Sequence, residues 1–109
     1  MKSLVIEAFG DAAAASAARR LGKPVRRGRP VHGSPSHAVT GMAALVGLTG
    51  ELQGRLMLDF DQGAIAELFG KSGDIRHDAA GLAEEVTARA LASLRRAGVR
   101  IASTPPMVF

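Results

Sequence analysis

The sequence predicts an α/β domain of the α+β type, in which an antiparallel sheet of about four strands is combined with two long helices. Three observations lead to this fold class. Two long segments repeat apolar residues at helical spacing, a central segment alternates at strand spacing, and a glycine-containing turn connects that strand to another. The 109 residues fit one domain, residues 1–109, and are too few for a second one.

The first long helix is expected over residues 3–20. Ser3 is a suitable N-cap, and apolar residues recur after it at helical spacing. The alanine-rich run at 12–18 favours helix by intrinsic propensity. The helix should end at Gly22, because glycine is the residue that most readily follows a helix C-terminus.

Three strands are expected in the next part of the chain. The first is short, Val25–Val31, and precedes a loop rich in proline and glycine. The second, residues 38–48, carries apolar or small side chains on both faces, which is typical of a strand covered on both sides. The turn TGELQG connects it to a third strand, RLMLDF at 55–60, so that the two form an antiparallel hairpin.

A short helix and a second long helix follow the hairpin. Asp61 is a suitable N-cap for the short helix, which should end at Gly70. The long helix is expected from Asp78 to Ala97, with Gly98 as its C′ residue. The residues of its apolar stripe, spaced by three and four positions, are Ala79, Leu82, Ala83, Val86, Ala90, Leu94 and Ala97. The segments VRIAS, TPP and MVF then predict a strand, a break and the start of another strand.

The composition excludes several classes of function. Without Cys the chain has no disulfide, no thiolate metal site and no Cys nucleophile. Aromatic residues make up 4% of it, with neither Trp nor Tyr, which argues against a stacking platform for bases. The P-loop, G-x-S-x-G and H-E-x-x-H motifs are absent. No apolar run is long enough to span a membrane, and Glu7 and Asp11 interrupt the segment that would be apolar in a signal peptide. We therefore expect a soluble cytoplasmic protein.

The net charge of +4 reflects two basic clusters. The larger cluster consists of Arg19, Arg20, Lys23, Arg26, Arg27 and Arg29, and the smaller of Arg95, Arg96 and Arg100. Such clusters attract nucleic acid or an acidic protein, but no interleaved aromatic residue accompanies them, and a solvated basic loop is the alternative. His32 and His37, five residues apart, would hold a metal only with a third ligand, and ordinary loop histidines are the alternative.

Polar residues lie off the apolar stripe of the long helix, and they are Glu84, Glu85, Thr87 and Arg89. Glu85 and Arg89 are spaced as an i, i+4 ion pair, which stabilises a helix by about 0.3 kcal/mol. This face of the helix is therefore either an active surface or simply the solvated side of an amphipathic helix.

Three pieces of the sequence, taken in their order, resemble the CheC/CheX/FliY family of chemotaxis phosphatases, and CheX most closely. LGKPVRRGRPV looks like the first strand of that family. ALVGLTGELQGRLMLDFDQGAIAELFG is similar to its hairpin and following helix, and this piece is the most specific. LASLRRAGVRIASTPP is similar to the end of its long helix and the strand before a Pro-containing segment. The likeness covers nearly all of the chain.

The resemblance implies a CheX-like fold, in which two long helices pack on one face of the antiparallel sheet. It also implies an activity, the removal of phosphate from the phospho-aspartate of a CheY-type response regulator. The family uses a Glu-x-x-Asn motif on the long helix, whose acid engages a Lys of the regulator and whose amide orients the attacking water. The regulator supplies the divalent metal, so we expect this chain to have no cofactor of its own.

The Glu-x-x-Asn motif is not intact, because the chain has no Asn. In one register the motif falls on Gly81 and Glu84, and in a shifted register on Glu84 and Thr87. The candidate catalytic residues are Glu84, Glu85 and Thr87, and the candidate docking residues are Arg89, Arg95 and Arg96. We expect weak or no hydrolysis of phospho-aspartate, because a threonine hydroxyl is shorter than the Asn amide.

Members of the family usually continue after the Pro-containing segment with two more antiparallel strands, whereas this sequence ends at Phe109. We therefore expect an open sheet edge beside Met107, Val108 and Phe109, and a homodimer with this region at or near the contact. Two other functions remain as alternatives. One is a non-catalytic dimeric interaction module of the same fold, and the other is a small basic nucleic-acid-binding protein.

Overall fold

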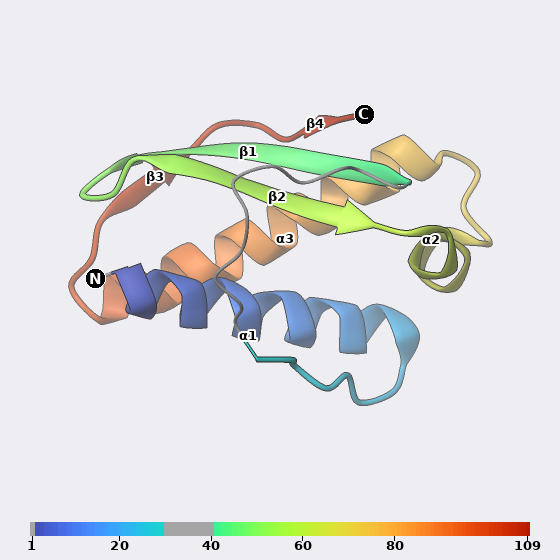
Figure 1. The fold of residues 1–109 in the computed structure, drawn as a ribbon, viewed down its shortest axis with the longest axis horizontal. Coiled ribbons are helices and arrows are strands. Elements are labelled where there is room, and N and C mark those ends of the chain that lie inside the picture. Colours follow the sequence, from blue (N-terminus) through green and yellow to red (C-terminus); the bar gives the residue numbers. More distant parts are fainter. Residues whose placement is uncertain (1, 30–40) are drawn as a thin grey trace.

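A computed structural model describes residues 2–29 and 41–109. The elements in chain order are α1 (Lys2–Leu21), β1 (Met42–Gly50), β2 (Gly54–Phe60), α2 (Gln62–Phe69), α3 (Ile75–Arg96), β3 (Ile101–Ser103) and β4 (Met107–Val108). The fold is α+β, with one four-stranded antiparallel sheet. Figure 1 shows the two long helices α1 and α3 side by side on one face of this sheet, running in opposite directions. The predicted fold class is confirmed.

Strand β1 is the centre of the sheet. It pairs with β2 along one edge and with β3 and then β4 along the other edge. The side chains that β1 directs toward the helices are Met42, Ala44, Val46 and Leu48, and all of them are buried. The two long helices complete this core with both small residues, such as Ala12 and Ala83, and larger ones, such as Phe9.

The outward face of the sheet corrects one expectation. The sequence predicted that the strand at 38–48 is covered on both sides, but the helices of the described chain cover one face only (Figure 1). Ala43 on the other face is nevertheless fully buried, and Asp59 and Phe109 flank it. Residues 38–40 of the predicted strand lie outside the described residues.

The hairpin turn depends on Gly50. Its φ of 112° is rarely adopted by residues with a side chain, and a Cβ there would lie 2.7 Å from the carbonyl oxygen of Arg100. The turn and the first residue of β3 are therefore packed closely together. The hairpin itself has the predicted position, with β2 beginning one residue earlier than expected.

The helix boundaries follow from their caps. Asp61 caps α2, and its carboxylate accepts a hydrogen bond from the Ala64 N–H at 2.8 Å, as expected. The long helix α3 begins at Ile75, three residues before the predicted start, because Asp74 serves as the N-cap and accepts from the His77 N–H at 3.1 Å. Gly98 has a φ of 84° and follows the helix as predicted.

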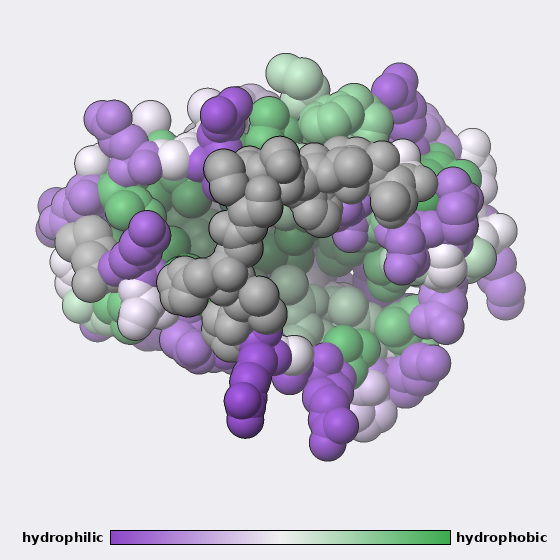
Figure 2. Space-filling model, in the orientation of Figure 1, coloured by the Kyte–Doolittle hydropathy of each residue, from purple (hydrophilic) through white to green (hydrophobic). Residues whose placement is uncertain are grey.

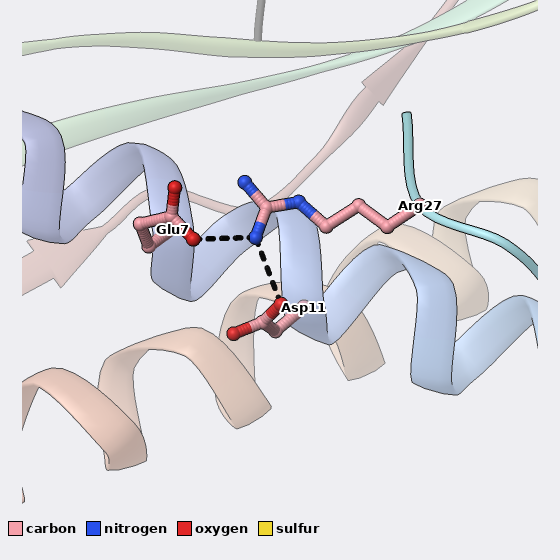
Figure 3. Close-up of polar contacts among 3 residues, drawn as sticks. All are labelled: Glu7, Asp11 and Arg27. Atoms are coloured by element: carbon pink, nitrogen blue, oxygen red, sulfur yellow. Dashed lines mark hydrogen bonds and ion pairs between the residues drawn. The ribbon is translucent and has the colours of Figure 1, made fainter. Parts of the chain in front are cut away.

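The predicted strand Val25–Val31 is wrong for the described part of it, since residues 24–29 form neither strand nor helix. Residues 30 and 31 lie outside the described residues. The segment instead folds back along α1, where the Arg27 Nη1 donates to Glu7 Oε2 at 2.6 Å and to Asp11 Oδ1 at 2.9 Å (Figure 3). No described strand pairs with residues 24–29.

Gly10 makes this contact possible. It lies one turn after Glu7 on the same face of α1, and a Cβ at this position would be 2.5 Å from Nε of Arg27. The missing side chain leaves room for the guanidinium to lie directly on the helix. We call Glu7, Gly10, Asp11 and Arg27 the arginine clamp.

The arginine clamp generates a prediction about acidity. The hydrogen bond from Arg27, together with its positive charge, lowers the pKa of Glu7. In Arg27→Gln the pKa of Glu7 should return to the usual range of an exposed glutamate, as followed by NMR titration of its carboxyl carbon. Because the folded pKa is lowered, the pair stabilises the protein at neutral pH, and this contribution is lost as the pH falls through the folded pKa.

Arg26→Gln is the matched control, because Arg26 is exposed and has no ion pair with any described residue. It should leave the titration of Glu7 unchanged. An identical pKa of Glu7 in the protein and in Arg27→Gln would show that the clamp does not form in solution.

Candidate functional site

The outer side of α3 and the edge of the sheet enclose a groove. Its wall on α3 is a row at helical spacing made of Glu84, Thr87, Ala88, Leu91, Ala92 and Arg95. Its opposite wall is the segment from Ser103 to Pro106, which connects β3 with β4. The hollow has a volume of about 580 Å³.

A second hollow of about 540 Å³ continues the first one toward the start of β3. Leu91 and Arg95 belong to both, and Arg100 and Ile101 line the far end. The two hollows therefore form one groove along the β3 side of the sheet. We call it the edge groove.

Thr87 is buried at the floor of the edge groove. Its exposed fraction is 5%, and its hydroxyl has no hydrogen-bond partner among the described residues. The sequence placed Thr87 on the solvated side of the helix, and this was wrong. The position lies one residue after the core residue Val86, so it borders both the core stripe and the groove.

The two adjacent glutamates of α3 have different surroundings. Glu84 is exposed and lines the edge groove. Glu85 points toward α1, where its carboxylate forms an ion pair with Arg19, and its side chain is only 23% exposed. The expectation that both lie in solvent is therefore confirmed for Glu84 and wrong for Glu85. The expected pair of Glu85 with Arg89 is replaced by the pair with Arg19.

The other parts of the predicted helix face agree with the structure. Leu82, Val86, Ala90 and Leu94 are all buried, with exposed fractions of 2% or less. The docking candidates Arg89, Arg95 and Arg96 are all exposed. Only Arg95 among them lines the edge groove. Of the six candidate residues, the structure thus brings Glu84, Thr87 and Arg95 together and leaves the remaining three on the other side of the helix.

Part of the larger basic cluster is engaged in contacts within the fold. Arg19 pairs with Glu85, Arg27 belongs to the arginine clamp, and the Arg20 guanidinium lies 6.0 Å from the centre of the Phe69 ring. Lys23, Arg26 and Arg29 are exposed and have no ion pair with any described residue. Half of the cluster therefore holds the fold together, which weakens the case for a dedicated nucleic-acid surface.

Metal binding finds no support in the described ranges. Within residues 2–29 and 41–109, no three His, Cys, Asp or Glu side chains are grouped as metal ligands. His32 and His37 lie outside these ranges. Among the helices that the structure describes, none is both long and apolar enough to cross a membrane.

Sequence reasoning missed two features of the site. One is the second stripe of α3, in which Ala88, Leu91 and Ala92 follow Thr87 at helical spacing, and this spacing was a readable signal. The other is the role of Thr104, whose hydroxyl accepts a hydrogen bond from the Gly47 N–H at 2.9 Å. A threonine before two prolines gave no sign of this contact.

The chain resembles known proteins at the level of solved structures. No protein-family model matches the chain, and no curated protein matches it. Solved structures do match. A CheC-like superfamily protein from a Shewanella species has 19% sequence identity and a TM-score of 0.85, and the alignment covers 100% of this chain and 77% of that one.

Two further structures extend this likeness. The chemotaxis protein CheX from Vibrio vulnificus has 16% identity and a TM-score of 0.82, with 96% of this chain and 76% of that chain covered. CheX from Borrelia burgdorferi, solved as a complex with CheY, BeF3 and Mg, has 20% identity and a TM-score of 0.66, with 95% and 75% covered. The expected resemblance to CheX is confirmed at the level of the fold.

The unpartnered hydroxyl of Thr87 generates a prediction about stability. Thr87→Val keeps the shape of the side chain and removes a buried hydroxyl that lacks a hydrogen bond, so it should raise the free energy of unfolding by about 1 kcal/mol. Urea denaturation measures this difference. Thr104→Val is the control with the opposite sign, because its hydroxyl is bonded to Gly47 and its loss should destabilise the protein by about 1 kcal/mol. A destabilised Thr87→Val would mean that the hydroxyl has a partner in solution.

Proposed function

We propose that this protein binds a receiver domain of the CheY type and is a chemotaxis-phosphatase-like protein with little or no hydrolytic activity. The observation that carries the proposal is the shared fold with CheX proteins, one of which was solved in complex with CheY. The fold gives this chain a long, exposed helix α3 with charged residues on its outer side. With a receiver as its partner, the protein would act in the cytoplasm.

The charges on α3 support this partner. Glu84 lies free at one end of the edge groove, as an acid that engages a Lys of the receiver would have to. Arg89, Arg95 and Arg96 are exposed and give the rest of the helix a positive rim. The phosphorylation pocket of a receiver is acidic, and complementary charge both orients a partner and speeds its association.

The surroundings of Thr87 and Glu85 support weak hydrolysis. A residue that holds the attacking water must present its polar group at the surface that meets the phosphoryl group. Thr87 is 5% exposed, and Glu85 is engaged by Arg19. The metal for the reaction would come from the receiver, and the chain would need no cofactor of its own.

We further propose that the protein is a homodimer with its contact on the outward face of the sheet. The register places Leu45 of β1 opposite both Met57 and Met107, and Phe109 lies beside them next to Ala43. Met107 is 63% exposed and Phe109 is 49% exposed. Figure 2 shows a hydrophobic area along the upper rim of the molecule, where this face of the sheet lies. Exposed apolar patches of this kind mark contact surfaces.

The alternative is a non-catalytic dimeric interaction module of the same fold. The free glutamate at the groove favours a specific protein partner in either case. The two functions differ in one measurable property, since only the first requires a difference between phosphorylated and unphosphorylated receivers.

A binding and turnover experiment tests the receiver proposal. A CheY-type receiver charged with acetyl phosphate should bind the protein, and phosphate release should be accelerated weakly or not at all. Glu84→Ala should weaken binding about tenfold, which corresponds to the loss of one charge-assisted contact. Glu67→Ala on α2 is the control, because Glu67 is exposed and distant from the edge groove in sequence.

Three outcomes would contradict the proposal. The first is the absence of any binding to charged receivers. The second is strong acceleration of phosphate release that disappears in Glu84→Ala, which would make Glu84 a catalytic residue. The third is a clear preference for a DNA duplex when the duplex and the receiver compete for the protein, which would favour the nucleic-acid alternative.

The dimer is tested by light scattering at micromolar concentration. Met107→Lys places a charge in the apolar patch and should shift the protein from dimer to monomer. Leu4→Lys is the matched control, because Leu4 is exposed to 42% but lies on α1, on the other face of the sheet from the patch. A protein that is monomeric before any substitution would refute the dimer.

A further inference from the structure

The edge of the sheet at β3 has unpaired backbone groups. The backbones of Arg100 and Thr104 bond to β1, through Glu51 and Gly47 respectively. Because antiparallel strands alternate, the N–H and C=O groups of Ile101 and Ser103 point to the opposite side, away from β1. No described strand lies on that side. Such an edge is a template for a further strand.

On this side of the sheet, the free edge of the described chain is confined to β3. In β4 the outward-pointing carbonyl belongs to Val108, and it accepts a hydrogen bond from the Arg76 Nη2 at 3.3 Å. The arginine of α3 thus occupies the position that a neighbouring strand would take. A strand that extends this sheet therefore has room beside β3 and not beside β4.

The outer side of α3 extends past the edge of the sheet at β3. Ala88 of the second stripe of α3 is exposed, and Leu91 and Ala92 are half-buried. The two hollows of the edge groove lie directly over these small side chains. An added strand beside β3 would direct alternate side chains onto this floor, where the small residues leave space for larger apolar ones.

Thr87 gives an independent sign of a missing partner. Its side chain lines the same groove, is about nine-tenths buried or more, and its hydroxyl is unpartnered within the described chain. Buried hydroxyl groups nearly always have a hydrogen-bond partner in folded proteins. A polar group on a segment lying in the groove would supply it.

The charges at the two ends of the groove define what fits it. Glu84 lies at the end near Pro106, and Arg95 and Arg100 lie at the end near Ile101. From Glu84 to Arg95 the helix rises about 16 Å, which corresponds to about five residues of extended strand. A strand antiparallel to β3 would run from the Glu84 end to the arginine end. Its first residues should therefore be basic and its last residues acidic.

We propose that the edge groove binds an extended segment of a partner protein, which joins the sheet as an additional antiparallel strand beside β3. The segment is about five residues long, apolar at alternate positions, basic at its N-terminal end and acidic at its C-terminal end. This inference goes beyond the proposed receiver binding and does not depend on it. Both proposals use Glu84 and Arg95 of α3, but only strand addition requires the outward backbone groups of Ile101 and Ser103.

The probe for this site is a synthetic five-residue peptide with the sequence Lys-Thr-Val-Thr-Glu and blocked ends, in which the Lys, Val and Glu side chains all face α3. The readout is amide hydrogen exchange by NMR on the full chain. Without peptide, the amides of Ile101 and Ser103 should exchange rapidly, since they face away from β1. With peptide at up to about 1 mM, both amides should be protected and should show the largest chemical-shift changes. The peptide with the two end charges exchanged should bind at least about tenfold more weakly.

Ser103→Pro tests the backbone requirement. Proline removes the outward N–H of residue 103 and leaves the ladder between β1 and β3 intact, because this N–H does not bond to β1. The variant should bind the peptide at least about tenfold more weakly. Ser103→Val is the matched control, since it keeps the N–H and should bind like the unchanged protein. The charge-exchanged peptide provides a test that needs no substitution, should Ser103→Pro fail to fold.

Two results would overturn the proposal. One is the absence of protection at Ile101 and Ser103 with peptide present, or equal binding by Ser103→Pro and Ser103→Val. The other is protection of these amides without peptide that increases with protein concentration, because the edge would then be occupied by a second copy of the chain. Failure of receiver binding would leave both amide measurements unchanged, so the two proposals can fail separately.

Discussion

Strand β1 is the constraint on which the rest of the structure depends, because every other described strand pairs with it. Its inward residues from Met42 to Leu48 form the surface against which α1 and α3 pack. On its outward face the side chain of Ala43 is fully buried. A strand used on both edges and on its inner face has to be apolar nearly throughout, and this explains why the hairpin was the most recognisable piece of the sequence.

The far edge of β1 is filled by an interrupted strand, and the edge groove follows from this interruption. Residues 105 and 106 interrupt the ladder after Thr104, because both are prolines and have no N–H to donate. Thr104 maintains the continuity, since its hydroxyl takes the Gly47 N–H that the ladder would otherwise leave unbonded. Among the described strands the sheet ends on this side at a short β3, and none of them covers the second stripe of small residues on α3 beneath it. The buried, unpartnered hydroxyl of Thr87 lies at this boundary, and local costs of this kind are typical of functional positions.

Periodicity predicted what depends on neighbouring residues, and it missed what depends on residues distant in the chain. The presence of α1 and α3, the buried stripe from Leu82 to Leu94 and the hairpin follow from patterns within one segment and were predicted, whereas the start of α3 was predicted three residues too late. Residues 24–29 were predicted as part of a strand, but the contact of Arg27 with Glu7 and Asp11 decides their path, and it requires the gap at Gly10. The site divides in the same way. The exposure of Glu84 follows from its place on the helix, whereas the burial of Glu85 requires Arg19 of another helix.

The pairing of Glu85 with Arg19 has a consequence for how α3 meets a partner. The two adjacent acids look equivalent in the sequence, but a partner that binds Glu85 would have to displace Arg19 from it. Glu84 has no ion pair with any described residue, and Arg95 is an exposed cation that lines the same hollow. These two charges have opposite sign and lie about 16 Å apart along the helix. A partner with one complementary pair of charges can therefore bind in only one orientation, because the reversed orientation would bring like charges together at both ends. The positions of these two charges on the helix therefore fix the orientation in which a ligand binds to this surface.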